Sequence, residues 1–566
     1  MAFEDLLPLV GHKGRFQILQ ALSLAVALIF LGTHFLIENI TAFVPEHRCW
    51  TPLLDNTSAL LNVSGNLNFS SLLKFSIPLD SNGKLEKCCR FFWPQGQPLL
   101  ANVTGQNLSQ LEMEPCVDGW VYDQSTITSS IVTEWDLVCD SWTLTSLSQS
   151  LFLAGILMGY LIGGYLSDRF GRKRTLSPSF FTLAVSSTGV AFAPSFQVYC
   201  CCRFLLGFSI SGVLLGGGSL IMEWSTTQHR HLVAIMLSMS ISLGHLFLGF
   251  LTYGIKDWRK LQLVVSVPLF AFFLITWWLP ESPRWLIVHN KYNDALKVLR
   301  KVSKINGVKE QSVTAEALRS TMGKEVDAAP SSYTILDLVR FPILCKRTLC
   351  VSFKRFSIGM LFYGLSLDLQ NLGHNIQMLQ VILGASNFLS RFGTLFIMNC
   401  LGRRTIVVAS FLLPGLFILS STFLPQGILH AVLAMLAINC IVVCISCDNV
   451  YSVELLPTVV RNKCMGLSLT IDRLGAMLAP MINMLKHNIP AMPQIIFAIM
   501  AITSSLIVFF FLPETKNKPM PDTIQDLECG HSREEARPRD EGETLVKINQ
   551  SEDCSRRLIE NKTTVV

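Results

Sequence analysis

The sequence predicts an all-α membrane protein made of two matched halves with six helices each. Half of the 566 residues are hydrophobic and only 15% are charged, and the mean hydropathy is +0.44, which excludes an ordinary soluble protein. Twelve apolar runs are each long enough to cross a bilayer. They are residues 16–37, 145–166, 176–194, 198–221, 232–254, 261–279, 348–367, 374–399, 405–423, 428–451, 464–486 and 493–512.

Three charged motifs support the division into halves, because each occurs twice at a nearly constant distance. The first copies are 168–173, Glu223 with Arg230, and 280–282; the second copies are 399–404, Glu454 with Arg461, and 513–515. The offsets between first and second copies are 231, 231 and 233 residues. Two copies of one membrane half-domain are typical of a transporter whose halves rock around a central site.

The loop charges predict the orientation and the domain organisation. Lys and Arg gather in alternate short loops, which marks the cytoplasmic side and places both termini there; Lys256, Arg259 and Lys260 are exceptions. The first run lacks the basic flank and cleavage site of a signal peptide, so it is retained as a span. The expected units are a cytoplasmic N-terminus (1–15), an N-terminal half (16–279), a cytoplasmic linker with short helices (280–346), a C-terminal half (347–514) and a disordered cytoplasmic tail (515–566).

The segment 41–142, between the first two spans, is predicted to be a glycosylated extracellular loop. Its N-x-S/T sequons are Asn56, Asn62, Asn68, Asn102 and Asn107, and Asn39 lies at its membrane edge. Its cysteines are Cys49, Cys88, Cys89, Cys116 and Cys139. Cysteines in an oxidising compartment usually pair, and an odd number leaves at least one thiol free or paired elsewhere. The pairing itself cannot be deduced from sequence.

Other partners have weaker signals or none. The chain ends in Thr564-Val565-Val566, which could add as a strand to a PDZ domain or form an inert tail. No spacing typical of a metal site appears, so no metal is expected, and no nucleotide-binding motif indicates ATP drive. Neither a cofactor nor nucleic acid is expected, and the chain has no acid/base or nucleophile constellation of an enzyme.

The duplicated motifs are predicted to act as gates at the cytoplasmic ends of the helices. The residues concerned are Asp168, Arg172, Glu223, Arg230, Arg403, Glu454 and Arg461. Asp168 is expected to accept hydrogen bonds from a helix N-terminus, and the basic residues are expected to pair with acids of neighbouring spans. Such a cluster would lock the helix ends in one state and release them in the other. The alternative is that these residues only anchor topology and cap loops.

Charges inside the spans are expensive and usually functional, so they indicate the substrate site. Arg473 lies near the middle of the eleventh span and Arg391 lies in the eighth. Two inward arginines with few compensating acids suit an anion. Alternatively, both form buried salt bridges, for instance with Asp472 or Asp368, although Asp472 points about 100° away from its neighbour Arg473 on an ideal helix.

Aromatic and amphipathic residues are expected around these arginines. Phe362 and Tyr363 lie mid-span in the seventh run, and His245 lies in the fifth. The repeat offset of 231 residues matches Ser242 with Arg473, which places His245 at a similar depth. A histidine in a span is about as often a helix–helix hydrogen-bonding residue as a ligand contact.

Several motifs resemble a known family. The run Gly164–Lys173 resembles the signature of the major facilitator superfamily, whose fold has twelve helices. Nearly the whole chain except the tail is similar to the organic anion/cation transporters, solute carrier family 22, which have a large extracellular loop after helix 1. That similarity rests on Met1–Phe3, His47–Trp50, Glu114–Trp120, Thr133–Cys139, Trp258-Arg259, Leu261–Leu263, Arg284–Leu286 and Leu512–Thr515.

The resemblance implies the organic anion branch. Anion members have Arg at the position of Arg473, where cation members have Asp, and usually Lys or Arg at the position of Arg391. Phe362-Tyr363-Gly364 and His245 also match the anion side. The implied substrates are urate, dicarboxylates, steroid sulfates or prostaglandin-like carboxylates. Departures from the family pattern are Met239, Ile241, Asn387 and Pro283; they indicate a softer pocket that favours flexible amphipathic anions.

The predicted function is alternating-access transport of a small organic anion across the plasma membrane. The anion would pair with Arg473 and Arg391 and pack on Phe362 and Tyr363. Transport is either facilitated diffusion or exchange against a counter-anion, and membrane lipid is the surrounding partner. A cation or zwitterion carrier on the same fold would instead be competed by quaternary amines. A non-transporting glycosylated receptor or scaffold would show no flux.

Overall fold

The protein is described here from a computed structural model. It describes residues 14–55, 83–92, 112–308, 340–368, 375–425, 427–457, 460–487 and 489–516, together with Gly11, Leu73 and 76–80. The five predicted glycosylation sequons and the C-terminal Thr564–Val566 lie outside these residues.

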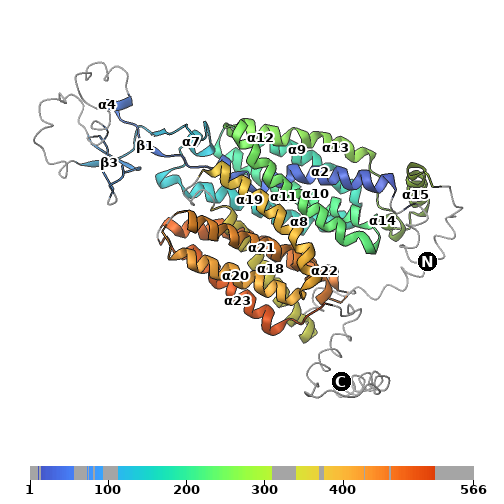
Figure 1. Cartoon of the computed structure of the whole chain (residues 1–566). Coiled ribbons are helices and arrows are strands. Elements are labelled where there is room, and N and C mark those ends of the chain that lie inside the picture. Colours follow the sequence, from blue (N-terminus) through green and yellow to red (C-terminus); the bar gives the residue numbers. More distant parts are fainter. Residues whose placement is uncertain are drawn as a thin grey trace, which may run out of the picture.

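The described chain forms two groups of long helices that lie side by side (Figure 1). The N-terminal half consists of α2 (Arg15–Leu36), α8 (Thr143–Phe170), α9 (Arg172–Ala191), α10 (Phe196–Glu223), α11 (Thr227–Gly254), and α12 (Trp258–Ser266) with α13 (Pro268–Trp278). The C-terminal half consists of α18 (Pro342–Ser366), α19 (Ile376–Cys400), α20 (Arg403–Thr422), α21 (Ile428–Leu455), α22 (Arg461–Asn483) and α23 (Met492–Phe511). This arrangement confirms the predicted all-α architecture with six spans in each half, the sixth being α12 joined to α13.

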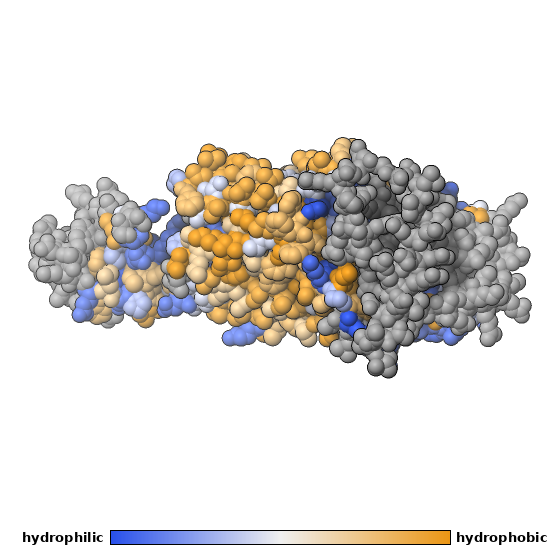
Figure 2. Space-filling view, turned by 90° about the horizontal axis from the view of Figure 1, so that it is seen from below, coloured by the Kyte–Doolittle hydropathy of each residue, from blue (hydrophilic) through white to orange (hydrophobic). Residues whose placement is uncertain are grey.

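Ten helical segments of the described chain are long and apolar enough to cross a membrane. The helices α9 and α18 complete the set, although each is more polar. The first contains many Ser and Thr residues, and the second carries Lys354 and Arg355 within its apolar run. Figure 2 shows a broad hydrophobic face across the helical body, with hydrophilic residues toward its ends. The chain is therefore a multi-pass membrane protein.

The predicted extracellular loop forms a small separate domain beyond one end of the helices (Figure 1). Its strand β1 (His47–Cys49) pairs antiparallel with β4 (Trp120–Tyr122), and β2 (Cys89–Phe91) pairs antiparallel with β3 (Met113–Pro115). Disulfides join Cys49 to Cys116 and Cys88 to Cys139, and Cys89 is free. The structure thus supplies the pairing that the sequence left open, with one thiol left over. We call this region the loop domain, and the adjoining end of the helices the loop-domain face.

Arg259, one of the basic residues that break the loop-charge rule, attaches the loop domain to the helices. Arg259, at the start of α12, pairs with Glu134 of the short helix α7 (Ile131–Trp135). It also donates to the carbonyl oxygens of Ala191 and Ala193, at 2.5 and 2.8 Å. The indole of Trp258 donates to Glu134 at 2.9 Å. Arg259 therefore has a structural partner on the loop-domain face and does not mark the cytoplasmic side.

The opposite end of the helices carries the duplicated motifs, and we call it the motif face. Two linker helices lie there, α14 (Pro283–Val288) and α15 (Tyr292–Asn306). Both lie within the segment 280–346, for which the sequence predicts short helices. Asn306 accepts a hydrogen bond from the backbone N–H of Phe16 at 2.9 Å and donates to the carbonyl of Gly11 at 3.0 Å. The linker thereby holds the start of α2.

The two halves meet closely at the loop-domain face. A Cβ on Gly249 of α11 would come within 2.8 Å of the backbone nitrogen of Val381 in α19, and one on Gly384 within 2.4 Å of Leu246. These glycines let the two helix backbones touch. The amide of Asn39, in the short helix α3 (Glu38–Thr41), donates to the carbonyl of Ser366 at 2.9 Å. Because it is buried and bonded there, Asn39 is not an accessible sequon in this state.

Candidate substrate site and gates

Arg473 lies midway along α22 and contacts both halves. Its guanidinium Nε is 3.4 Å from Asp472 Oδ2, and Nη1 lies 3.5 Å from the hydroxyl oxygen of Tyr363. Across the interface, its Cζ stands 5.4 Å from the ring centroid of Tyr160 in α8. The alternative in which Arg473 pairs with Asp472 is therefore confirmed, because the long arginine side chain reaches its neighbour although the two residues point about 100° apart on an ideal helix. A guanidinium has five N–H donors, so these contacts leave capacity for an anion.

Arg391 is buried midway along α19 and has no acidic partner among the described residues. It is 7% exposed, and its Nε has no hydrogen-bond partner there. One turn earlier, the buried amide of Asn387 also lacks a partner within the described chain. A buried charge without a partner is costly, so a bound anion would stabilise this arrangement. The suggested ion pairs with Asp368 do not form, since Asp368 pairs with Lys486 at 3.0 Å.

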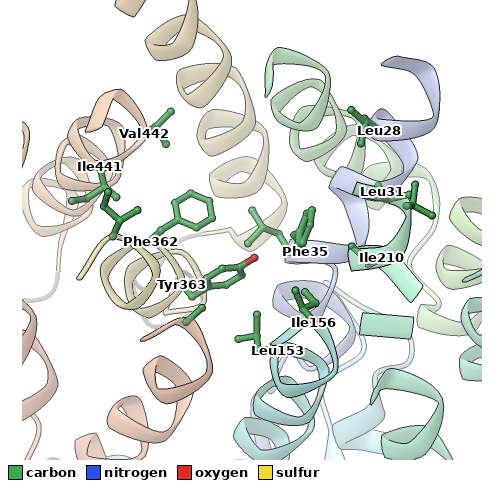
Figure 3. Close-up of a cluster of buried hydrophobic side chains, with 14 of the residues drawn as sticks. Leu28, Leu31, Phe35, Leu153, Ile156, Ile210, Phe362, Tyr363, Ile441 and Val442 are labelled. Carbon is green, nitrogen blue, oxygen red and sulfur yellow. The ribbon is translucent and has the colours of Figure 1, made fainter. Parts of the chain in front are cut away.

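Phe362, Tyr363 and His245 form an aromatic wall next to Arg473. The rings of Phe362 and Tyr363 meet edge to face at 5.3 Å, and His245 stacks on Phe362 at 6.5 Å. Figure 3 shows both aromatic rings pointing from α18 toward Phe35 of the other half. They lie in the last turns of α18, closer to its end than the predicted mid-span position.

The structure thus brings four of the five predicted substrate residues together, and the fifth lies along a neighbouring helix. Gly384 packs against the backbone of His245, and Arg391 follows it by two turns of α19, or about 10 Å along the helix axis. Arg391 and the aromatic wall therefore border the same interface between the halves.

Two further charge clusters inside the helices were missed by the sequence reasoning. In the N-terminal half, Arg203 pairs with Glu38 and donates to Gln149 Oε1 at 2.8 Å. In the C-terminal half, Asp448 pairs with both Lys354 and Arg355, the latter at 2.6 Å. All five charged side chains are buried. Each lies in or at the edge of an apolar run, so the criterion that identified Arg473 would also have found them.

The interior charges do not balance, and the imbalance lies in one half. Among the described residues, the helices of the N-terminal half bury one charged base and one acid, Arg203 and Glu38. Among the described residues the C-terminal half carries four interior bases and two acids: Lys354, Arg355, Arg391, Arg473, Asp448 and Asp472. The interior therefore has a surplus of two positive charges, both on the side that carries Arg473. This arrangement favours an anion at the interface.

The motif clusters are nearly identical in the two halves. Arg172 pairs with Asp168 at 2.8 Å and with Glu223 at 3.2 Å, and Arg403 pairs with Glu454 at 3.6 Å. Each cluster joins helices of one half, as expected from basic residues pairing with acids of neighbouring spans. Arg230 and Arg461 donate to nearby carbonyl oxygens, those of Met222 and Leu456, at 3.3 and 3.2 Å.

The helix N-termini at the motif face are capped by glutamates rather than by Asp168. Glu281 accepts from the backbone N–H of Lys173 at 3.0 Å, and Glu514 accepts from Arg403 N–H at 2.8 Å. The carboxylate of Asp168 instead forms an ion pair with Arg172. Gly171 precedes the first cap with φ of 109°, and a Cβ there would lie 2.5 Å from Glu281 Oε2. Glycine is therefore required at that turn.

Known proteins are similar to this chain over most of its length. The sequence profile of the family described as "Sugar (and other) transporter" matches residues 101–525. Solute carrier family 22 member 11 of Homo sapiens is 44% identical over 96% of this chain and 99% of that protein. The chain belongs to solute carrier family 22. It is therefore a membrane transporter of the major facilitator type and not an enzyme.

Other relatives of this solute carrier are similar over their whole length. The steroid transmembrane transporter SLC22A24 of Microcebus murinus is 46% identical over 97% of this chain and 100% of that protein. Solute carrier family 22 member 12 of Homo sapiens is 43% identical over 93% of this chain and 96% of that protein.

Solved structures show the same fold. The xylose transporter XylE from E. coli in its inward open conformation has a TM-score of 0.55 at 18% identity, covering 67% of this chain and 88% of XylE. Its partially occluded inward open form also has a TM-score of 0.55, at 15% identity, covering 88% of this chain and 99% of XylE. At these identities the likeness concerns the fold alone.

Proposed function

We propose that this solute carrier moves amphipathic organic anions across the plasma membrane by alternating access. The observation that carries the proposal is the surplus of two positive interior charges in the C-terminal half. The anionic group pairs with Arg473 and is assisted by Arg391, while the apolar body packs on Phe362 and Tyr363. A ligand that is itself positive would add to the surplus, so the charge pattern disfavours a cation carrier.

The orientation follows from the chemistry of the two faces. The loop-domain face carries two disulfides, which form in oxidising compartments, so we assign it to the extracellular side. The motif face carries the basic clusters and becomes cytoplasmic, together with both termini. On this assignment Asn56, Asn62, Asn68, Asn102 and Asn107 are glycosylation sites, and Thr564–Val566 is a cytoplasmic PDZ ligand.

The close contact of the halves at the loop-domain face supports an inward-facing state. To open outward, the bonds of Asn39 to Ser366 and of Gln377 to the carbonyl of Thr252, both 2.9 Å, must break. The motif clusters keep the motif-face ends of each half together while the halves rock. The driving force is a gradient of the anion itself or of an exchanged counter-anion.

Amphipathic anions such as steroid sulfates suit this site better than small dicarboxylates or urate. Met239 and Ile241 replace aromatic residues of the family pattern, which leaves a softer wall. A relative is named a steroid transmembrane transporter, which supports a bulky apolar substrate for this chain too.

Uptake in oocytes expressing the full chain tests the proposal. Labelled estrone sulfate, urate, glutarate and tetraethylammonium are compared between the native chain and Arg473→Gln, with surface biotinylation as the expression control. We expect estrone sulfate uptake that Arg473→Gln removes without loss of surface protein. Uptake of tetraethylammonium alone would favour the cation carrier, and no flux of any compound would favour a receptor or scaffold.

A further inference from the structure

A cavity lies outside the central site, between the loop domain and both halves. Its volume is about 510 Å³, within the range of roughly 300–1,000 Å³ found for small-molecule sites. Trp142 and Ser146 line it from the first turn of α8, Lys87 from the loop domain, and Leu367 and Lys486 from the C-terminal half. It includes none of the five residues proposed for the central site.

The charges of the wall favour an anion. Its two acids are already neutralised: Glu38 pairs with Arg203, and Asp368 pairs with Lys486 at 3.0 Å. Lys87 differs, because its partner Glu46 is not part of the wall and has a side chain that is 78% exposed. Such an exposed ion pair contributes little to stability, because water screens its charges. An anionic group inside the cavity can therefore displace Glu46 from its ion pair with Lys87 at little cost in free energy.

The rest of the wall suits an apolar body. Trp142, Leu137 and Leu367 supply hydrophobic surface from three different parts of the chain. Thr145 and Ser146 supply hydroxyl groups beside it. The combination of a partly exposed lysine with an apolar wall matches an amphipathic organic anion.

We propose that this cavity is a second, outer binding site for an amphipathic organic anion, with the anionic group at Lys87 and the apolar body against Trp142 and Leu367. This proposal rests on the proposed function only in the choice of an amphipathic organic anion as the probe. Since its walls come from both halves and the loop domain, a bound anion connects all three. Occupation therefore opposes the rocking of the halves and inhibits transport from the loop-domain side.

Equilibrium binding of tritiated estrone sulfate to the purified full-length protein tests the second site. The native chain should bind about two molecules, and Arg473→Gln, which disables the central site, about one. Ser146→Trp, which fills the outer cavity, should also bind about one, and the double variant almost none. Lys87→Gln should weaken the outer site at least about fivefold, as expected when a charged partner is lost.

Matched controls separate binding from folding. Leu147→Trp places the same tryptophan on the next residue of α8, which is 44% exposed and outside the cavity. Lys84→Gln removes an exposed lysine that is not part of the wall. Both should bind like the native chain, and all variants should keep its melting temperature. The outer site is refuted if Ser146→Trp binds as much as Leu147→Trp. If Arg473→Gln still binds two molecules while Ser146→Trp binds one, the outer site stands and the central proposal fails.

Discussion

The two halves of this transporter share the charged motif clusters that we propose as gates, but they differ in their interior charge. At the motif face, Arg172 with Glu223 and Arg403 with Glu454 repeat the same pair, and Glu281 and Glu514 repeat the same cap. Among the described residues inside the helices, the N-terminal half balances one acid with one base, whereas the C-terminal half has two bases in excess. We propose that the shared clusters support the movement that both halves perform. We propose that the unshared charges recognise the substrate.

The largest effect on transport is expected from removing the charge that only one half carries. Arg473→Asp should lower kcat/KM for estrone sulfate by at least about a hundredfold, because losing one partner of a buried charge pair costs about 2–5 kcal/mol. Uptake kinetics with surface biotinylation measure it. Arg473→Lys keeps the charge and should retain part of the activity. Uptake by Arg473→Asp at the native rate would contradict the role.

Arg391 should have a smaller effect, because it assists and does not hold the anion alone. We expect Arg391→Gln to raise KM about tenfold, corresponding to about 1.4 kcal/mol, with little change in kcat. Arg391→Lys serves as the matched control that keeps the positive charge. An unchanged KM in Arg391→Gln would place this arginine outside the site and reduce the asymmetry to Arg473.

Asp472 competes with the substrate for Arg473, so its removal should act in the opposite direction. Its Oδ2 lies 3.4 Å from Arg473 Nε. Asp472→Asn should lower KM about fivefold, or about 1 kcal/mol. Asp472→Glu retains the competing charge and should leave KM near the native value. A rise in KM for the asparagine variant would show that Asp472 positions the guanidinium and does not compete with the anion.

Matching substitutions in the two proposed gates should have equal effects on transport, and these effects should be the smallest of those predicted here. Glu281→Gln and Glu514→Gln each weaken the cap of one helix N-terminus. Each should reduce the maximal rate about threefold, within the 0.3–1 kcal/mol range of a charge near a helix end, and leave KM unchanged. Asp294→Asn, which alters an exposed ion pair on α15, is the control. A change in KM from only one of the two glutamates would contradict the symmetry of the gates.

Much of this architecture could be predicted because it depends on local sequence patterns. Apolar runs predict spans, and motif copies at offsets of 231 and 233 residues predict two halves. An arginine such as Arg473 is conspicuous wherever the surrounding residues are apolar. The same reasoning extends to Lys354, Arg355 and Asp448, which the sequence reasoning did not use.

Other features depend on contacts through space. The pairing of Cys49 with Cys116 depends on how the loop domain folds. The role of Arg259 required knowing that Glu134 lies beside it. The sequence left the pairing of Arg473 with Asp472 open, because an ideal helix gives the direction of Cβ and not the reach of a long side chain. Sequence singled out Arg473 and Arg391, and the balance of the interior charges appeared only when the clusters of Arg203 and Asp448 and their partners were known.

We propose that the C-terminal half holds the anionic group of the substrate. A cryo-electron microscopy structure of the purified protein with an iodinated aryl sulfate is the most direct test. We expect sulfate density within hydrogen-bonding distance of Arg473, with the iodinated ring against Phe362 and Tyr363. Density for the sulfate on the N-terminal half, near Ser242 and away from Arg473, would contradict it.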